Sequence, residues 1–261
     1  MGSATRSARQ SAREAVASTA GADRLAGEQL LAVARVIDAS SGLQSALIAS
    51  DSAASAVMRD RVFAELSAPA RSVLNAALSQ SWSSTRDLVA GIEELGIRVI
   101  ASSASDAEAI ARELQAVGAL VAGNADLELA LSGTRGTPES RGALIDALLD
   151  GKASAETRAI IGHLVRAPRG RRIGELVRTG SELVADEAGR GLATVTVARP
   201  LTDAQLAAVS ATVRERYGRD HLVVQVVDPS VVGGARIQVG YEVIDGSIAA
   251  RLTDLTLQLA R

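Results

Sequence analysis

Apolar residues recur at helical spacing through most of the chain, and this pattern constrains the fold more than any other feature. From residue 4 to about residue 189, alanine-rich segments alternate with short stretches of Ser, Gly, Asp and Pro. One such segment places four apolar residues on a single stripe, at i, i+4, i+7 and i+11: Leu88, Ile92, Leu95 and Val99. Leu30, Val33 and Ile37 form a similar stripe earlier in the chain. The sequence therefore predicts helices that pack on other helices.

The core of these helices has to be aliphatic. Hydrophobic residues make up 47% of the chain, but aromatic residues make up only 2%. The aromatic residues are Phe63, Trp82, Tyr217 and Tyr241. Ala, Leu, Val and Ile must therefore fill the core, and few side chains remain that could stack on bases or sugars.

The helical part of the sequence resembles itself. Residues 30–47 align without a gap to residues 114–131, and the order of features continues after this block. Corresponding pairs include Leu30 and Leu114, Phe63 and Ile145, Val73 and Ile160, and Leu95 and Leu183. An internal repeat of this kind is typical of stacked structural units. We predict two tandem helical bundles, at residues 1–103 and 104–189, in which the last helix of the first bundle also opens the second.

After residues 189–191 the apolar period changes from helical to two. Ala193, Val195 and Val197 alternate with threonines, as in a half-buried strand. The elements expected next are a helix from the capping box Thr202–Gln205 to Gly218, strands at 223–227 and 235–239, a stretch at 240–244 that continues or pairs with the last strand, and a final helix after Ser247. These form a C-terminal α+β domain at residues 190–261. The predicted fold class is α+β and predominantly α.

Charge, cysteine content and hydropathy exclude several classes of protein. The 28 basic and 30 acidic side chains give a net charge of −2, which argues against a strongly basic nucleic-acid binder and against an acidic disordered chain. The absence of cysteine excludes disulfides and thiolate metal sites and favours an intracellular protein. No stretch looks like a secretory signal or reaches the roughly 18 apolar residues of a membrane span. We therefore expect no nucleic-acid partner and no direct membrane insertion.

Motifs that would carry catalysis are incomplete. The segment Gly151–Ser154 resembles the end of a phosphate loop, but Ala147 and Ala153 replace the glycine and the hydroxyl residue that the motif requires. His163 and His221 have no ligand spacing for a metal, and His163 is expected to be a partly buried helix residue. The sequence therefore predicts neither an enzyme nor a cofactor site.

Two charged features allow structural interpretations. Glu93 and Glu94 point about 100° apart on a helix, so a solvated helical face explains them better than acid–base catalysis. Four arginines cluster at residues 166–172. We interpret this cluster as a solvated loop between helices, and the alternatives are a site for an acidic protein partner or for nucleic acid.

Residues 232–252 combine a Gly-Gly pair, an extended apolar run, another glycine, an Asp-Gly-Ser triplet and a helix with Arg-Leu. This pattern resembles the signature of the ATP synthase delta subunit family, which includes the mitochondrial oligomycin-sensitivity-conferring protein. The signature residues are Gly233, Gly234, Gly240, Asp245, Gly246, Ser247, Arg251 and Leu252. We expect Gly233, Gly234 and Gly246 to adopt positive φ in tight turns, and Asp245 to form a cap or an Asx turn. Ser247 is expected to be a helix N-cap, and for Arg251 a partner contact and a structural role are both open.

The rest of the chain is also similar to this family. Residues 9–15 loosely resemble its first helix, although Ser11 stands where an aromatic residue is expected. The family's six-helix N-terminal bundle agrees with the prediction for residues 1–103. A duplicated bundle is similar to what actinobacterial members show.

The resemblance implies a mechanical, non-catalytic function. Delta subunits belong to the peripheral stalk, or stator, of the proton-translocating ATP synthase and link the catalytic head to the stalk. In the family, the N-terminal bundle binds the N-terminus of the alpha subunit and the C-terminal domain binds the C-terminus of the b subunit. The implied location is peripheral, at the cytoplasmic face of the cell membrane. The alternative is a helical adaptor for other proteins, unrelated to the ATP synthase.

Overall fold

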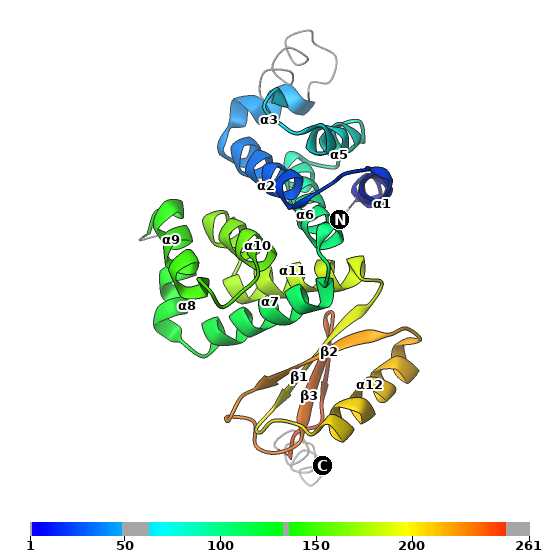
Figure 1. Cartoon of the computed structure of the whole chain (residues 1–261), viewed down its shortest axis with the longest axis vertical. Coiled ribbons are helices and arrows are strands. Elements are labelled where there is room, and N and C mark those ends of the chain that lie inside the picture. Colours follow the sequence, from blue (N-terminus) through cyan, green and yellow to red (C-terminus); the bar gives the residue numbers. More distant parts are fainter. Residues whose placement is uncertain (1, 49–62, 133–135, 249–261) are drawn as a thin grey trace, which may run out of the picture. The chain divides into compact units, whose positions relative to one another are not determined.

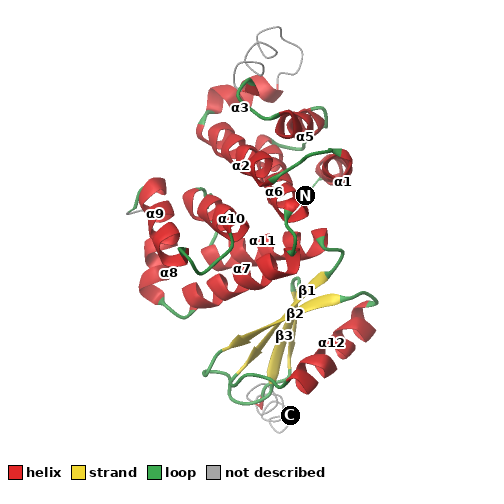
Figure 2. Cartoon of the chain, viewed as in Figure 1, coloured by secondary structure: helices red, strands yellow, loops and turns green. Residues whose placement is uncertain are grey.

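A computed structural model of the chain describes residues 2–48, 63–132 and 136–248 (Figures 1 and 2). The helices are α1 (Ser3–Ser18), α2 (Arg24–Ala39), α3 (Ser41–Ile48), α5 (Ala68–Leu78), α6 (Thr85–Ser103), α7 (Ala107–Ala122), α8 (Ala125–Ser132), α9 (Pro138–Leu149), α10 (Ala155–Arg166), α11 (Ile173–Glu187) and α12 (Asp203–Tyr217). The strands are β1 (Gly191–Val197), β2 (His221–Val227), β3 (Ala235–Val239) and β4 (Glu242–Asp245). The predicted class, α+β and predominantly α, is confirmed.

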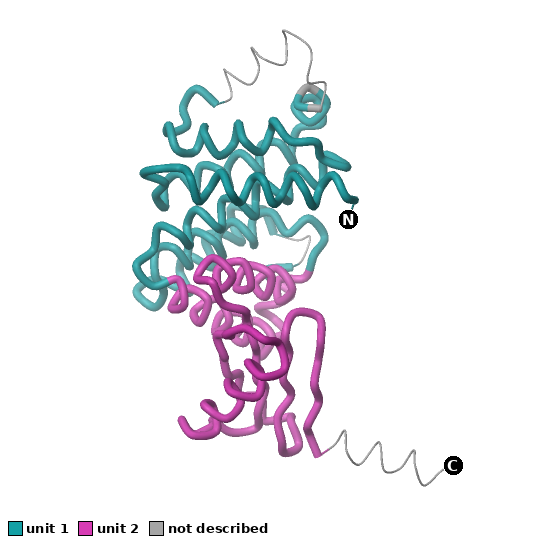
Figure 3. The backbone as a smooth tube through the Cα atoms, turned by 90° about the vertical axis from the view of Figure 1, so that its right-hand side faces the viewer, with its two compact units in different colours: residues 1–106, 130–171 teal, residues 107–129, 172–261 magenta. Residues whose placement is uncertain are grey.

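The contacts within the chain form two compact units (Figure 3). Unit 1 combines residues 1–106 with residues 130–171, and unit 2 combines residues 107–129 with residues 172–261. This grouping describes contacts and not repeats. The division into segments at residues 103 and 189 stays a prediction.

In unit 1 the helix α2 packs along α6, and α1 packs on α5 and α6. The predicted stripe of Leu88, Ile92, Leu95 and Val99 is buried in an aliphatic core. Two glycines let α2 and α6 approach closely: a Cβ on Gly27 would lie 2.8 Å from the carbonyl oxygen of Gly96. The helix α10 contacts α9, α2 and α6. Residues of the second predicted segment therefore pack directly on helices of the first.

In unit 2 the helix α7 packs on α11, and these helices contact β2 and β1 respectively. The sheet has the strand order β2-β1-β3-β4. Strands β1 and β2 are parallel and joined through α12, with Gly191 paired to His221, whereas β3 is antiparallel to both β1 and β4. The predicted capping box of α12 is present, with Thr202 and Gln205 bonded reciprocally, and its C-cap Gly218 has φ +68°. The stretch after Gly240 pairs with β3 as the separate strand β4.

The described elements of the two predicted helical segments correspond in order. The ungapped alignment that pairs Leu30 with Leu114 also pairs α3 with α8 end to end. Corresponding positions on α2 and α7 are buried: Leu30 and Leu114, Val33 and Val117, Ile37 and Val121. The N-caps Ser67 of α5 and Ser154 of α10 also correspond, and each accepts a bond from a backbone N–H of the first turn. The helix-by-helix superposition of the segments stays a prediction.

Candidate functional site

The glycines of the C-terminal signature form tight turns around β3 and β4. Gly233, Gly234 and Gly240 have φ values of +65°, +76° and +58°, in the left-handed region that favours glycine. A Cβ on Gly234 would lie 2.4 Å from the carbonyl oxygen of Gly246. No other residue type fits there, because the obstacle is backbone.

The other signature residues close the same turn. The backbone N–H of Ser247 donates to Asp245 Oδ1 at 3.0 Å, which is the predicted Asx turn, and Arg236 Nη2 donates to Asp245 Oδ2 at 2.9 Å. Hydrogen bonds from Ser247, joined by those from Arg236, lower the pKa of Asp245 to about 2. Ser247 is buried and directly precedes helical Ile248. Asp245 therefore holds the turn as a carboxylate.

One prediction about the signature is wrong, and two of its residues lie beyond the described chain. Gly246 does not adopt a positive φ. Its lack of a side chain serves a close approach instead, because a Cβ there would lie 3.1 Å from the carbonyl oxygen of Ala235, to which the Gly246 N–H donates. Arg251 and Leu252 lie outside the described residues. The described signature thus forms a structural turn.

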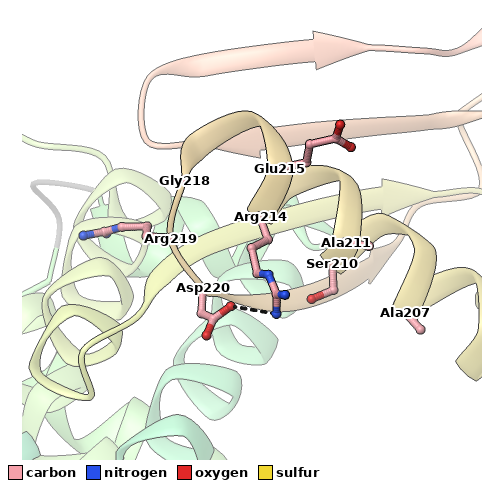
Figure 4. A pocket seen from close by; sticks show the side chains of 8 residues that line it. All are labelled: Ala207, Ser210, Ala211, Arg214, Glu215, Gly218, Arg219 and Asp220. Carbon is pink, nitrogen blue, oxygen red and sulfur yellow. Dashed lines mark ion pairs between the residues drawn. The ribbon is translucent and has the colours of Figure 1, made fainter.

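A cleft in unit 2 lies along α12 and has a volume of about 830 Å³ (Figure 4). Small side chains of α12, Ala207, Ser210 and Ala211, line it together with charged residues at the C-terminal end of the helix. There Arg214 pairs with Asp220 at 3.6 Å. We call this surface the α12 cleft. An open groove of small residues with charges at one end suits a polypeptide better than a small molecule.

A second cleft, of about 300 Å³, lies in unit 1 between the end of α5 and the start of α6. Its apolar lining consists of Leu47, Leu78, Trp82 and Leu88. The indole N–H of Trp82 donates to the carbonyl oxygen of Ala77 at 2.8 Å, and the ring lies against Gly91, where a Cβ would be 2.1 Å from Trp82 Cη2. We call this surface the Trp82 cleft. Its tryptophan is held in one position by both neighbours.

The acidic pair on α6 contradicts the solvated face expected from the sequence. Glu93 is 5% and Glu94 8% exposed. Glu94 pairs with Arg98 at 3.0 Å and with Arg9 at 3.3 Å. The expectation was wrong because periodicity alone does not show which charged residues meet partners from elsewhere in the chain.

The arginine cluster at 166–172 is also not a free solvated loop. Arg169 and Arg171 both pair with Glu93, the second at 2.9 Å. Arg169 adopts φ +48°, a conformation that costs a non-glycine residue roughly 1–2 kcal/mol. Arg166 pairs with Asp146 of α9 at 3.1 Å. The loop is therefore folded onto acidic partners of the same chain.

His163 completes this buried cluster. It is 2% exposed, and its Nε2 lies 2.8 Å from Glu93 Oε2. Burial alone raises the pKa of Glu93, but the hydrogen bond to His163 and the charges of Arg169, His163 and Arg171 together lower it to about 2. Burial lowers the pKa of His163, against the opposing effect of Glu93. Glu93 is thus ionised and His163 neutral near pH 7.

Metal sites and single membrane-spanning helices are not found among the described residues. Within residues 2–48, 63–132 and 136–248, no group of His, Asp or Glu is arranged to hold a metal ion. In the same ranges no single helix is long and apolar enough to cross a membrane, although the bent pair of α7 and α8 together meets that test of length and composition.

Comparisons with known proteins identify the family. The family model described as ATP synthase delta (OSCP) subunit matches residues 97–259, more than half of the chain. The chain belongs to this family. An ATP synthase subunit delta from Leifsonia xyli is 43% identical over 263 residues, which cover 100% of both chains. The ATP synthase subunit delta of Arthrobacter sp. is 33% identical, over 89% of this chain and 90% of the relative. That of Streptomyces avermitilis is 35% identical, over 89% of this chain and 88% of the relative.

Family membership decides between the two functions left open by the sequence. The chain is a non-catalytic stator subunit of the ATP synthase, and the alternative of an unrelated helical adaptor is wrong. It is part of the complex at the membrane and partners with other subunits of that complex. The family model begins at residue 97, within α6, so it covers residues of the predicted second bundle and of the predicted C-terminal domain.

Proposed function

We propose that the chain joins the N-terminus of the alpha subunit to the C-terminus of the b subunit, at the cytoplasmic face of the membrane. A stator subunit that links the head to the stalk has to bind both at once and so requires two separate surfaces. The Trp82 cleft lies in unit 1 and the α12 cleft in unit 2. Two clefts on different compact units suit this connecting role.

The Trp82 cleft supports docking of the alpha subunit on the first helical segment. Its apolar part is formed by the indole and three leucines and its polar part by Gln80, Ser81, Ser83 and Ser84. A groove with both kinds of lining suits an amphipathic helix. In the second segment the corresponding loop, residues 167–172, carries Arg169 and Arg171, which pair with Glu93. The first segment therefore offers an open groove, whereas this loop of the second is occupied by internal ion pairs.

Titration of the full chain with an alpha N-terminal peptide tests this docking. Trp82 is the only tryptophan, so its fluorescence reports on the cleft, while calorimetry reports on binding at any site. We expect both signals to saturate at the same peptide concentration. Ser81→Arg, in the exposed rim of the cleft, should weaken binding at least tenfold, and Ser72→Arg, exposed on α5 outside the cleft, should not. If calorimetry detected binding of the peptide but the fluorescence of Trp82 did not change, the alpha site would lie elsewhere.

The α12 cleft supports docking of the b subunit on the C-terminal domain. Ala207 and Ala211 leave room for a partner helix to approach the α12 backbone, and Arg214, Arg219 and Asp220 can pair with its charges. Ala211→Arg should fill the cleft and weaken binding of a soluble b C-terminal fragment at least tenfold. Ala208→Arg is the matched control, because Ala208 is exposed on the same helix but does not line the cleft. Equal affinities for the two variants would contradict this site.

We also infer that residues 1–103 and 104–189 are duplicated bundles and that residues 190–261 form the domain that binds the stalk. The corresponding element order and buried positions support the duplication. The start of the family match at residue 97, inside α6, agrees with a helix that ends one bundle and opens the next. A helix-by-helix superposition of an experimental structure tests this inference, and unrelated paths of the two segments would refute it.

A further inference from the structure

His163 lies between two charged residues from different helices of unit 1. Its Nε2 is 2.8 Å from Glu93 Oε2 of α6, and its Nδ1 is 2.9 Å from Arg35 Nη1 of α2. The side chains of His163 and Glu93 are 2% and 6% exposed. We call these three residues the His163 cluster. It connects α10 with α2 and α6, across a long separation in sequence.

The two partners determine the protonation state of the imidazole. Arginine has only donors, so Nδ1 must accept the hydrogen bond from Arg35. The single ring proton of the neutral form must then be on Nε2, from which it is donated to the Glu93 carboxylate. Only the neutral Nε2–H tautomer satisfies both contacts.

We propose that the His163 cluster is a proton-sensitive lock that holds α10 against α2 and α6 and is released when His163 becomes protonated. This goes beyond the binding of alpha and b, because it concerns the rigidity of the helical part and not a partner surface.

Protonation removes one contact and adds a positive charge beside three arginines. The new proton occupies the Nδ1 lone pair that accepts from Arg35, so that hydrogen bond is lost. Positive groups already face the site from two elements, Arg35 from α2 and Arg169 and Arg171 from the loop after α10, while Asp38 of α2 acts on Arg169 with the opposite charge. Glu93 is the acidic partner of His163, and both loop arginines already engage it.

The surrounding charges also favour the neutral form of His163 at neutral pH. Burial is the largest effect that lowers the pKa of His163, the hydrogen bond and charge of Glu93 oppose it, and Arg35 and Arg169 lower it further. Arg166 of α10 adds positive charge near Arg35 and is itself paired with Asp146 of α9. Release therefore requires a pH below the ordinary range of histidine, and the lock is closed at neutral pH.

The positions that the sequence alignment pairs with the cluster do not carry the same residues. In the alignment Glu93 of α6 corresponds to Ser181 of α11, and His163 of α10 corresponds to Ala76 of α5. Ser181 is buried and donates to the carbonyl oxygen of Val177 in its own helix at 2.9 Å. Neither Glu93 nor His163 has an equivalent residue at its aligned position. This is expected for a contact made where residues 130–171 meet residues 1–106.

Two measurements on the full chain test the proposal. Nitrogen-15 NMR of the imidazoles reports tautomer and charge directly, and His163 is distinguished from His221 by a His221→Gln variant. Because the chain has no cysteine, Val36→Cys on α2 and Leu144→Cys on α9 provide two exposed spin-label sites without background, and their distance reports opening. Spectra are compared at about pH 7.5 and at stepwise lower pH values, below the ordinary pKa of histidine.

At about pH 7.5 we expect the Nε2–H tautomer and one narrow distance distribution. At the lower pH at which the His163 imidazole becomes protonated, a second, longer distance should appear. His163→Gln should keep the single distance over the whole pH range, and His221→Gln should open like the wild type. An Nδ1–H tautomer, an imidazole that stays neutral, or a protonated imidazole with an unchanged distance would overturn the proposal. The NMR result stands without the His163 variant if that variant does not fold.

Discussion

Two helix pairs occupy corresponding places in the sequence: α2 with α6, and α7 with α11. Both pairs bury the same positions, such as Val33 and Val117, but they differ where the helices meet. Gly27 and Gly96 allow backbone contact in the first pair, whereas the corresponding residues of the second pair are Ala111 and Val184, both buried. The periodicity of apolar residues thus determines which face packs, and residue size determines how closely the helices approach.

The two pairs also differ in one buried polar position. Glu93 of α6 bonds to His163, Arg169 and Arg171, from outside its own pair. Ser181, its counterpart on α11, is satisfied by its own helix. A buried carboxylate needs charged partners, whereas a hydroxyl needs one backbone carbonyl. The first pair therefore depends on a distant segment for its stability, and the second does not at this position.

Substitution of the two polar counterparts should give the largest difference. Glu93→Gln leaves Arg169 and Arg171 without their carboxylate and should lower the free energy of unfolding by about 3 kcal/mol, the low end for a broken buried pair because both arginines keep some solvent. Ser181→Ala should lower the free energy of unfolding by about 1 kcal/mol. Urea unfolding of both variants checks this, and equal losses would contradict the distinction.

Acid should remove the same contribution in the wild type. The pKa of Glu93 is lowered to about 2, so the unfolded chain binds a proton at this site first as the pH falls. The stabilisation is complete above the unfolded pKa of about 4.5 and is lost progressively toward pH 2, up to about 3 kcal/mol. Glu93→Gln should show a smaller loss over this pH range in urea unfolding. A parallel pH dependence of both proteins would show that Glu93 is not the titrating group.

Substitutions where the paired helices meet, at Gly27 and at its counterpart Ala111, should change the stability less. A Cβ in Gly27→Ala would lie 2.5 Å from Ile100 Cγ1 and 2.8 Å from the Gly96 carbonyl, and should lower stability by about 1–2 kcal/mol despite the better helix propensity of alanine. The reciprocal control, Ala111→Gly, should lower the free energy of unfolding by about 1 kcal/mol from helix propensity and by a further amount from the loss of a buried methyl group. A stabilised Gly27→Ala variant in thermal unfolding would mean that the first pair tolerates the wider spacing.

The smallest expected effect concerns the starts of α6 and α11. Ser84 caps α6 by accepting from the backbone N–H of Asp87, but its counterpart Arg172 makes no side-chain cap of α11. Arg172→Ser should therefore stabilise the chain by about 0.5–1 kcal/mol, and Ser84→Ala should destabilise it by about as much. Thermal unfolding of both variants checks this. If both substitutions changed the stability in the same direction, the two helix starts would not be equivalent.

Local features of the fold were predictable because their causes are local. The stripe of Leu88 and Ile92, the capping box at Thr202 and the Asx turn at Asp245 each depend on residues a few positions apart. The Trp82 cleft and the α12 cleft were not predictable, because α3, α5 and α6 together build the first, and the second is a surface shape. No short motif encodes either cleft.

Charged residues mark the limit of sequence reasoning in this chain. Glu93 and the arginine cluster look solvated in sequence, but Glu93 meets His163, a partner 70 residues away. The arginine count could have suggested acidic partners, but not which ones.

The sequence by itself determined the helical part, the change to strands after residue 189 and the glycine turns at Gly233 and Gly234, because periodicity and φ are properties of short segments. Its family signature also indicated the stator role. Only the tertiary structure decided that Glu93 is buried and that His163 is held as one tautomer. A buried charge is stable only beside its partners, and folding brings those partners together.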